Sequence, residues 1–235
     1  MKLGVVTPTR GGEREAFVAQ ARQLCAKQTY KPANHYIIDY RPKGQYVDMV
    51  ERILLGVELA HRDKCTHLAI WEDDDYYRYD YLANMAEQLT DDTAMMGSSY
   101  TPTYHLGSRR WGLEQAHTTS VSLHRSVGSV KFLHWALTHI TDEKAKGMWY
   151  MDHHLWATAV AVKAKAQVVN TELFDCVAMK HGIGMCGSGY HNRKRTDVYP
   201  YTDADMHWLK KFTGDDYAFY ASQSQVLNKD STEVI

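Results

Sequence analysis

The alternation of strands and helices in the N-terminal part is the strongest constraint on how this chain can fold. Short apolar runs typical of buried strands occur at 2–7, 35–39 and 66–71. Each is followed by a segment with apolar residues at helical spacing, so we expect helices at 13–27, 46–62 and 80–89. This alternation predicts an α/β fold, in which helices flank a mainly parallel, Rossmann-like central sheet.

Beyond residue 92 the alternation is weaker. We expect strands at 93–99, 118–124 and 167–171, and helices at 129–140 and 152–164. The first two of these strands should be joined by an aromatic and Gly-rich loop. The segment 180–202 is rich in Gly, His, Arg and Tyr, which is typical of a long functional loop or lid.

The composition argues against several classes of protein. The formal net charge is −1 at pH 7, so no overall basic field would draw the chain to nucleic acid or membrane. No stretch approaches the ~18 apolar residues of a membrane span, and the N-terminal apolar run is too short for a signal peptide. The cysteines show no CxxC spacing, so neither a zinc cluster nor a disulfide framework is expected. These features favour a cytoplasmic protein with reduced thiols.

Four consecutive acidic residues, Glu72, Asp73, Asp74 and Asp75, directly follow the apolar run at 66–71. Such a charge run is most often a solvated turn between a strand and a helix. It also suits a divalent cation, because hard cations take carboxylate oxygens and neutralise the repulsion between them. We call these four residues the acidic run.

Polar residues also follow the two strands before it. Thr7 to Arg10 lie at the end of the first strand, and Asp39 ends the second. Each feature alone could be a turn or a helix cap. In a parallel sheet, however, the carboxyl ends of the strands meet at one edge, and ligands bind there. The sequence therefore predicts that these groups converge with the acidic run.

Five segments, taken in order, resemble family 2 glycosyltransferases of the GT-A fold. They are "VVTPTR" (5–10), "IID" (37–39), "AIWEDDDYYRYDYL" (69–82), "TTSVSLHRS" (118–126) and "YMDHHLW" (150–156). The resemblance covers roughly residues 1–165. It implies an enzyme that transfers a hexose or pentose from a nucleotide-sugar donor, with a UDP-sugar favoured.

The resemblance also implies roles for individual residues. Pro8, Thr9 and Arg10 would begin the nucleotide site, and Asp39 would meet the base or ribose. Part of the acidic run would serve as the DxD-type motif that holds Mn²⁺ or Mg²⁺ on the donor diphosphate. Because the run begins with Glu72 where Asp is usual, the DxD pair is ambiguous.

We favour Asp73 and Asp75 as that pair, with Asp75 as the most direct metal ligand and Asp73 also in contact with the donor. Asp152 would be the catalytic base of an inverting transfer, since it corresponds to the family's base and stands where the helical periodicity of 152–164 begins. An aspartate there also has a purely structural explanation, because Asp is among the best helix N-caps.

The loop within 180–202 offers a second set of polar groups. Lys180 and Arg193 are expected to contact the donor, and His181 and His191 to supply further metal ligands. A flexible basic surface loop is the plainer alternative. The cluster "HNRKR" (191–195), with tyrosines around it, also fits a phosphate-bearing acceptor such as a hydroxymethylated base in DNA. That acceptor would suit a virus-encoded enzyme acting in the host cytoplasm.

The expected organisation is one GT-A-like domain over 1–220. Its donor-binding half would be about 1–100, its acceptor half about 101–220, and residues 221–235 would form a flexible tail. Three alternatives remain at this point: a transferase acting on a cell-surface glycan or lipid, a nucleotidyltransferase, and a non-catalytic nucleotide-binding module. The sequence is silent on the oligomeric state.

Overall fold

The computed structural model describes residues 1–39, 48–115, 120–139, 151–170, 175–181 and 199–229. The chain forms two compact units. Unit 1 comprises Met1–Asp73, Tyr79–Ser99 and Ala116–Thr171, and unit 2 comprises Asp74–Arg78, Tyr100–Gln115 and Glu172–Ile235. The first passage out of unit 1 thus falls within the acidic run, between Asp73 and Asp74.

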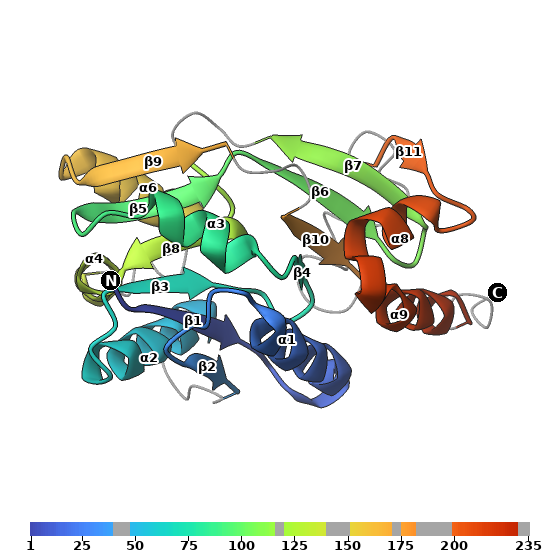
Figure 1. Cartoon of the computed structure of the whole chain (residues 1–235), viewed down its shortest axis with the longest axis horizontal. Coiled ribbons are helices and arrows are strands. Elements are labelled where there is room, and N and C mark those ends of the chain that lie inside the picture. The colour runs from blue at the N-terminus through green and yellow to red at the C-terminus, as the bar shows by residue number, and fades with distance from the viewer. Residues whose placement is uncertain (40–47, 116–119, 140–150, 171–174, 182–198, 230–235) are drawn as a thin grey trace. The chain divides into compact units, whose positions relative to one another are not determined.

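Unit 1 is built on a six-stranded sheet in the order β2-β1-β3-β8-β5-β9 (Figure 1). The strands are β1 (Leu3–Pro8), β2 (His35–Ile38), β3 (His67–Ile70), β5 (Thr93–Ser98), β8 (Ser126–Ser129) and β9 (Lys165–Val169). β1 pairs in parallel with β2 and β3, and β5 pairs in parallel with β9. β8 lies antiparallel between β3 and β5. All of these strands except β8 therefore run in one direction, which confirms the predicted mainly parallel sheet.

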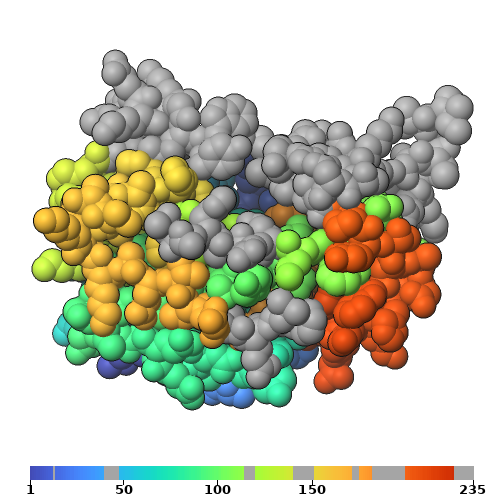
Figure 2. All heavy atoms as spheres, turned by 90° about the horizontal axis from the view of Figure 1, so that it is seen from above, coloured from blue at the N-terminus to red at the C-terminus, as the bar shows by residue number. Residues whose placement is uncertain are grey.

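The carboxyl ends of β1, β2, β3, β5 and β9 share one edge of this sheet, which we call the strand-end edge. β9 forms one side of the sheet, and its side chains reach the surface (Figure 2).

Helices cover both faces of the unit 1 sheet (Figure 1). α1 (Glu15–Lys27) and α3 (Tyr81–Gln88) lie on one face, and they are tied together because the Gln28 side chain accepts a hydrogen bond from the Leu82 amide, at 3.0 Å. α2 (Asp48–Arg62), α4 (Val130–Thr138) and α6 (Met151–Ala161) cover the other face. Their apolar residues form a continuous core with Val6, Leu68 and Ile70 of the sheet.

Gly56 allows α2 to lie close to β1. A Cβ atom at this position would come within 2.3 Å of Cγ2 of Val6, far inside van der Waals contact. The missing side chain therefore lets α2 pack directly against β1.

The expected strand at 118–124 is wrong over its described residues. Ser120 makes only an isolated bridge, Leu123–Arg125 form a 3-10 turn, and the strand β8 begins at Ser126. Val121 and Leu123 are buried in the core, which explains why their apolar spacing resembled a strand. The turn that they anchor leads the chain into β8.

Unit 2 contains a five-stranded sheet in the order β11-β7-β6-β10-β4. The strands are β4 (Tyr76–Tyr77), β6 (Tyr100–His105), β7 (Arg110–Gln115), β10 (Cys176–Lys180) and β11 (Tyr201–Thr202). β6 and β7 form an antiparallel hairpin where we expected a loop. The aromatic residues that suggested a loop have high strand propensity and pack within the unit: Trp111 of β7 contacts Trp208 and Phe212.

Two helices complete unit 2, α8 (His207–Thr213) and α9 (Tyr217–Lys229). The buried Asp203 carboxylate accepts hydrogen bonds from the Trp208 and Leu209 amides, both at 3.0 Å, and from the Tyr104 hydroxyl at 2.9 Å. It therefore caps α8 and joins it to β6. The segment expected to be a flexible tail is helical as far as Lys229. No helix among the described residues is long and apolar enough to cross a membrane.

Candidate functional site

The residues predicted to form the nucleotide site lie at the strand-end edge of unit 1. Pro8 ends β1, Thr9 follows it and is buried, and Asp39 follows β2 and is exposed. β1 and β2 pair with Pro8 opposite Ile38, so the segments leaving the two strands are neighbours. The Thr9 amide donates to the Ile38 carbonyl at 2.9 Å.

A buried arginine of α2 holds these strand ends. Arg52 of α2 is 3% exposed. Its Nη1 donates to the carbonyls of Thr9 and, at 3.1 Å, of Ile38, and its Nε pairs with Asp48. Arg52 is buried because carbonyls at the strand ends need a donor once water is excluded. Arg10, exposed beside them, pairs through Nε with the same Asp48 at 3.0 Å.

His124 and Asp152 reach the same edge through the chain topology. β8 runs opposite to its neighbours, so its first residue, Ser126, and the preceding turn with His124 lie at the strand-end edge. A short connection leads from α6 to the first residue of β9, so the first turn of α6 lies at the other end, towards the strand-end edge. The Trp156 indole N–H, one turn further along α6, donates to the Ser126 hydroxyl at 3.4 Å, in agreement with this placement.

Asp152 is half-buried in the first turn of α6. Its Oδ1 accepts a hydrogen bond from the His153 amide at 2.7 Å. A carboxylate at this end of a helix is favoured by the helix dipole in its ionised form. The environment therefore suits both a base and a structural anchor for the helix start.

Members of the acidic run have different partners. In unit 1, Asp73 is buried and forms an ion pair with Arg14, with an Nη2–Oδ1 distance of 2.5 Å. In unit 2, Asp74 pairs with the buried His181, with an Nε2–Oδ2 distance of 2.7 Å. The run is thus not a solvated turn, because three of its four members are buried.

Asp75 is also held within unit 2. Its Oδ1 accepts from the Met179 amide at 2.8 Å, and its backbone carbonyl accepts from the Tyr220 hydroxyl at 3.1 Å. Burial, and then the nearby Asp75 charge, raise the pKa of the Tyr220 hydroxyl, so that this hydroxyl stays protonated and donates. Because this hydrogen bond holds Oδ1, the orientation of the whole Asp75 carboxylate is fixed, and so is the position of its second oxygen.

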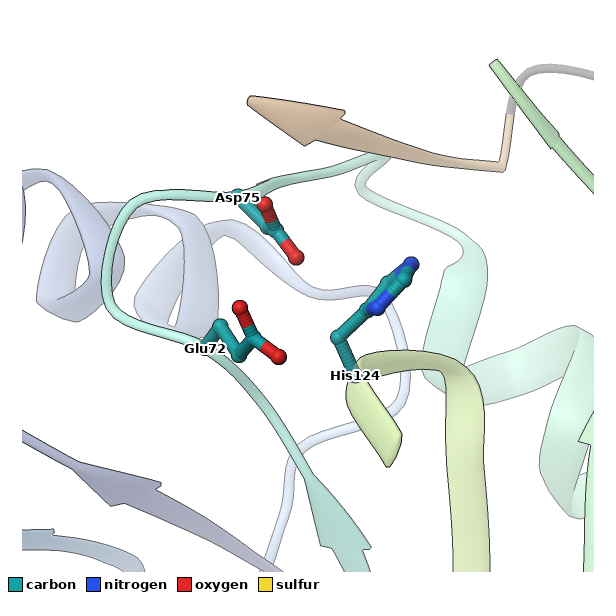
Figure 3. A group of neighbouring side chains, drawn as sticks. All are labelled: Glu72, Asp75 and His124. Carbon is teal, nitrogen blue, oxygen red and sulfur yellow. The ribbon is translucent and has the colours of Figure 1, made fainter. Parts of the chain in front are cut away.

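A possible metal-binding group is formed by Glu72, Asp75 and His124 (Figure 3). One ligand atom from each lies within 4.8 Å of the others. Glu72 and Asp75 are close because they belong to one short stretch of chain, and His124 comes from the turn before β8. Two carboxylates and one imidazole suit a divalent cation such as Mn²⁺, which accepts oxygen and nitrogen ligands.

Two of the ligands in this group were not predicted. Glu72 belongs to the acidic run, but the sequence predicted Asp73 in its place, and Asp73 is paired with Arg14. His124 carries no metal-ligand spacing in the sequence, because the antiparallel insertion of β8 brings it to the edge. His181, predicted as a ligand, is paired with Asp74.

The remaining predicted residues belong to the segment that we expected to be a C-terminal loop, 180–202. Lys180 is the last residue of β10 and is half-buried. His191 and Arg193 lie outside the described residues, as does the rest of the basic cluster.

His35 is the first residue of β2; its Nε2 contacts the Thr7 hydroxyl at 2.9 Å, and its ring packs edge-on against Trp71. Burial, and then the Arg22 charge, lower the pKa of His35 to about 4. The imidazole is therefore neutral at pH 7.

No protein-family model matches the chain, and no curated protein sequence does either. Solved structures do match. A glycosyltransferase involved in the glycosylation of the major capsid of PBCV-1 aligns with a TM-score of 0.51 and 8% identity, over 72% of this chain and 82% of that one. S. aureus TarS residues 1–349 with UDP aligns with a TM-score of 0.51 and 10% identity, over 99% and 92% of the two chains. The same TarS segment with UDP-GlcNAc gives 0.50 and 13%, over 80% and 61%.

The chain has a GT-A-like glycosyltransferase fold. At this level of identity the similarity establishes the fold, and the predicted fold class is thereby confirmed. The roles of individual residues depend on the geometry of the strand-end edge.

Proposed function

We propose that this protein is a metal-dependent glycosyltransferase that moves a sugar from a nucleotide-sugar donor, with UDP as the favoured nucleotide, to an acceptor hydroxyl. The observation that carries the proposal is the group of Glu72, Asp75 and His124 beside the ends of β1 and β3. In open α/β sheets, nucleotides bind beyond these strand ends. The GT-A-like fold and the neighbours that hold UDP and UDP-GlcNAc support the same reading.

The three side chains fit Mn²⁺ better than Mg²⁺, because an imidazole nitrogen is a poorer ligand for the harder Mg²⁺. Bound there, the cation would act as a Lewis acid that stabilises the departing diphosphate. The protein's own contribution is to hold the ligands in place: the Met179 amide orients the Asp75 carboxylate, and burial keeps the His124 imidazole among fixed neighbours. In this proposal Asp73 has a structural role at the site, because Arg14 holds it in an ion pair.

The nucleotide would lie along the ends of β1 and β2. Pro8 and Thr9 would form its floor, Asp39 would accept hydrogen bonds from the base or ribose, and Arg10 would donate to its oxygen atoms. Asp39 and Arg10 are both exposed, so they can reach a ligand without rearrangement of the core. Lys180 and Arg193 stay in the proposal as additional donors to the leaving group, and His191 as an additional ligand.

Asp152 would take the proton from the acceptor hydroxyl as that oxygen attacks the anomeric carbon. The bond to the diphosphate oxygen breaks in the same step, and the configuration at the anomeric carbon inverts. The ionised carboxylate favoured at the helix start is the form that this step requires.

A screen by thermal shift tests the donor. A nucleotide sugar that binds only the folded state raises the melting temperature by mass action. We expect a UDP-sugar to raise it in the presence of Mn²⁺ and to do so much less in the presence of EDTA. The absence of a shift with every nucleotide sugar, with and without Mn²⁺, would overturn the proposal.

DNA bearing hydroxymethylated bases is the acceptor that we propose, on the strength of the basic cluster at 191–195. Binding of such DNA should weaken steeply with salt, and the double variant Arg193→Ala, Lys194→Ala should flatten that dependence, because fewer phosphate contacts release fewer counterions. No DNA binding at low salt would direct the search to a glycan, lipid or protein acceptor.

A further inference from the structure

Three charged residues of unit 1, Arg10, Asp48 and Arg52, are linked by two ion pairs at the proposed nucleotide site. We call this chain of ion pairs the relay. Arg10 pairs with Asp48, and Asp48 pairs in turn with Arg52. The two arginines use different oxygens of the same carboxylate: Arg10 Nε meets Oδ2 at 3.0 Å, and Arg52 Nε meets Oδ1. Asp48 is therefore a bridge that is engaged on both sides.

The inner end of the relay is rigid. Arg52 is buried, and its Nη1 also donates to the carbonyl of Thr9, directly after β1, and to the carbonyl of Ile38, the last residue of β2. A guanidinium that satisfies two carbonyls and a carboxylate in a fixed geometry leaves little freedom to any of them. Asp48, in the first turn of α2, is thus tied to the sheet as well as to its own helix.

The outer end of the relay faces solvent. The Arg10 side chain is 53% exposed, and Asp48 is its one ion-pair partner among the residues that the structure describes. Because Arg10 is attached to Asp48 through Nε, its two terminal nitrogens are left to donate elsewhere. An arginine held in this way is preorganised to meet oxygen acceptors, since part of its side-chain entropy is lost before the ligand arrives.

We propose that Asp48 and Arg52 are positioning residues for donor binding: Arg52 fixes Asp48 and the ends of β1 and β2, and Asp48 holds Arg10 in the conformation that contacts a nucleoside diphosphate. This inference rests on the proposed function, because it assigns the ligand of Arg10 to the donor nucleotide. It adds two residues that make no contact with the ligand themselves.

A double-mutant cycle on UDP affinity tests the relay. Calorimetry in the presence of Mn²⁺ would compare the wild type, Arg10→Gln, Asp48→Asn and the double variant. Arg10→Gln removes charge-assisted hydrogen bonds and should weaken UDP binding roughly tenfold or more. Asp48→Asn keeps the shape and one oxygen acceptor, and should weaken UDP binding about two- to fivefold, the usual value of one exposed ion pair.

The decisive result is the effect of Asp48→Asn in the Arg10→Gln background. If Asp48 acts through Arg10, the second substitution should change the dissociation constant by less than its error. The same two- to fivefold loss in both backgrounds, or no loss in either, would overturn the inference. If Asp48→Asn lowered only the melting temperature, Asp48 would be structural, which also overturns it. Failure of the wild type to bind UDP or any other nucleoside diphosphate would instead remove the proposed function and the relay with it.

Two further variants separate positioning from general damage. Arg52→Lys keeps the charge but cannot satisfy two carbonyls and a carboxylate together, so it should weaken UDP binding in the wild-type background more than in the Arg10→Gln background. If Arg52→Lys does not fold, the cycle with Asp48 still decides. Asp92→Asn breaks a comparable exposed pair, between Asp92 and Lys165 at 3.0 Å, at the opposite edge of the sheet, where β5 begins, and should leave UDP binding unchanged.

Discussion

Substitution of Asp152 by asparagine separates the two roles that an aspartate can have at a helix start. Asn retains an oxygen that can accept from the His153 amide, but it cannot take a proton. We expect Asp152→Asn to keep its UDP affinity and lose transfer rate by roughly two to four orders of magnitude. Turnover under saturating donor, together with calorimetry, measures both effects.

Asp152→Ala serves as the control for the structural role, because loss of the hydrogen bond from the His153 amide should cost about 1 kcal/mol of stability. Wild-type turnover by Asp152→Asn would place the base elsewhere or indicate a retaining mechanism.

The metal group can be tested at Glu72, which is only half-buried and so tolerates substitution. Glu72→Gln preserves size but removes one negative charge from the three ligands, and we expect Mn²⁺ affinity to fall at least tenfold. Titration of Mn²⁺ followed by electron paramagnetic resonance measures this directly.

Asp92→Asn is the matched control, since it removes an exposed carboxylate at the opposite edge of the same sheet. Equal Mn²⁺ affinity for Glu72→Gln and the wild type would contradict the assignment of Glu72 as a ligand.

His35 should make the stability depend on pH. Burial lowers its pKa from 6.5 to about 4 in the folded state, so between these values the unfolded chain binds a proton that the folded chain does not. Stability should therefore fall as the pH is lowered from about 6.5 towards 4, by at most ~3 kcal/mol from this residue.

Urea unfolding at a series of pH values checks the slope. His35→Gln should flatten it in this window, whereas substitution of the exposed His153 by Gln should leave it unchanged. An unaltered slope for His35→Gln would show that another group is responsible.

At the scale of elements, the contact between α2 and β1 is the packing feature most sensitive to a single methyl group. Alanine in an unobstructed helical position stabilises relative to glycine by roughly 0.5–1 kcal/mol. At Gly56 the new Cβ would lie 2.3 Å from Cγ2 of Val6, so we expect Gly56→Ala to destabilise by about 1–3 kcal/mol instead. The urea midpoint gives the sign, and a rise in the midpoint would contradict the packing described for α2.

The three parallel strands and three helices of the first ninety residues were predictable, because buried parallel strands and amphipathic helices have distinct apolar periods, whereas the two-residue strand β4 was not predicted. The hairpin of β6 and β7 was not, since its aromatic and glycine residues fit a loop as well as a strand. β8 was misplaced because Val121 and Leu123 are buried in a turn rather than in a strand.

Prediction of the site is limited because some of its contacts join segments that are far apart in the chain. The charge of the acidic run and its place after a strand indicate a candidate cation site, and Asp75 belongs to the candidate group of Glu72, Asp75 and His124. Local sequence does not reveal which carboxylates are neutralised by a distant Arg14 or His181. His124 and Arg52 depend on contacts between segments far apart in the chain, which carry no short-range signal.

For the whole molecule, the central claim is that the strand-end edge of unit 1 is a metal-dependent nucleotide-sugar site. A crystal structure with UDP and Mn²⁺, recorded at the manganese absorption edge, tests the metal and the nucleotide together. We predict an anomalous peak against the carboxylate of Glu72 and the imidazole of His124, with the uridine beside Thr9 and Asp39. A manganese peak away from these residues, or a nucleotide bound elsewhere on the chain, would contradict the account.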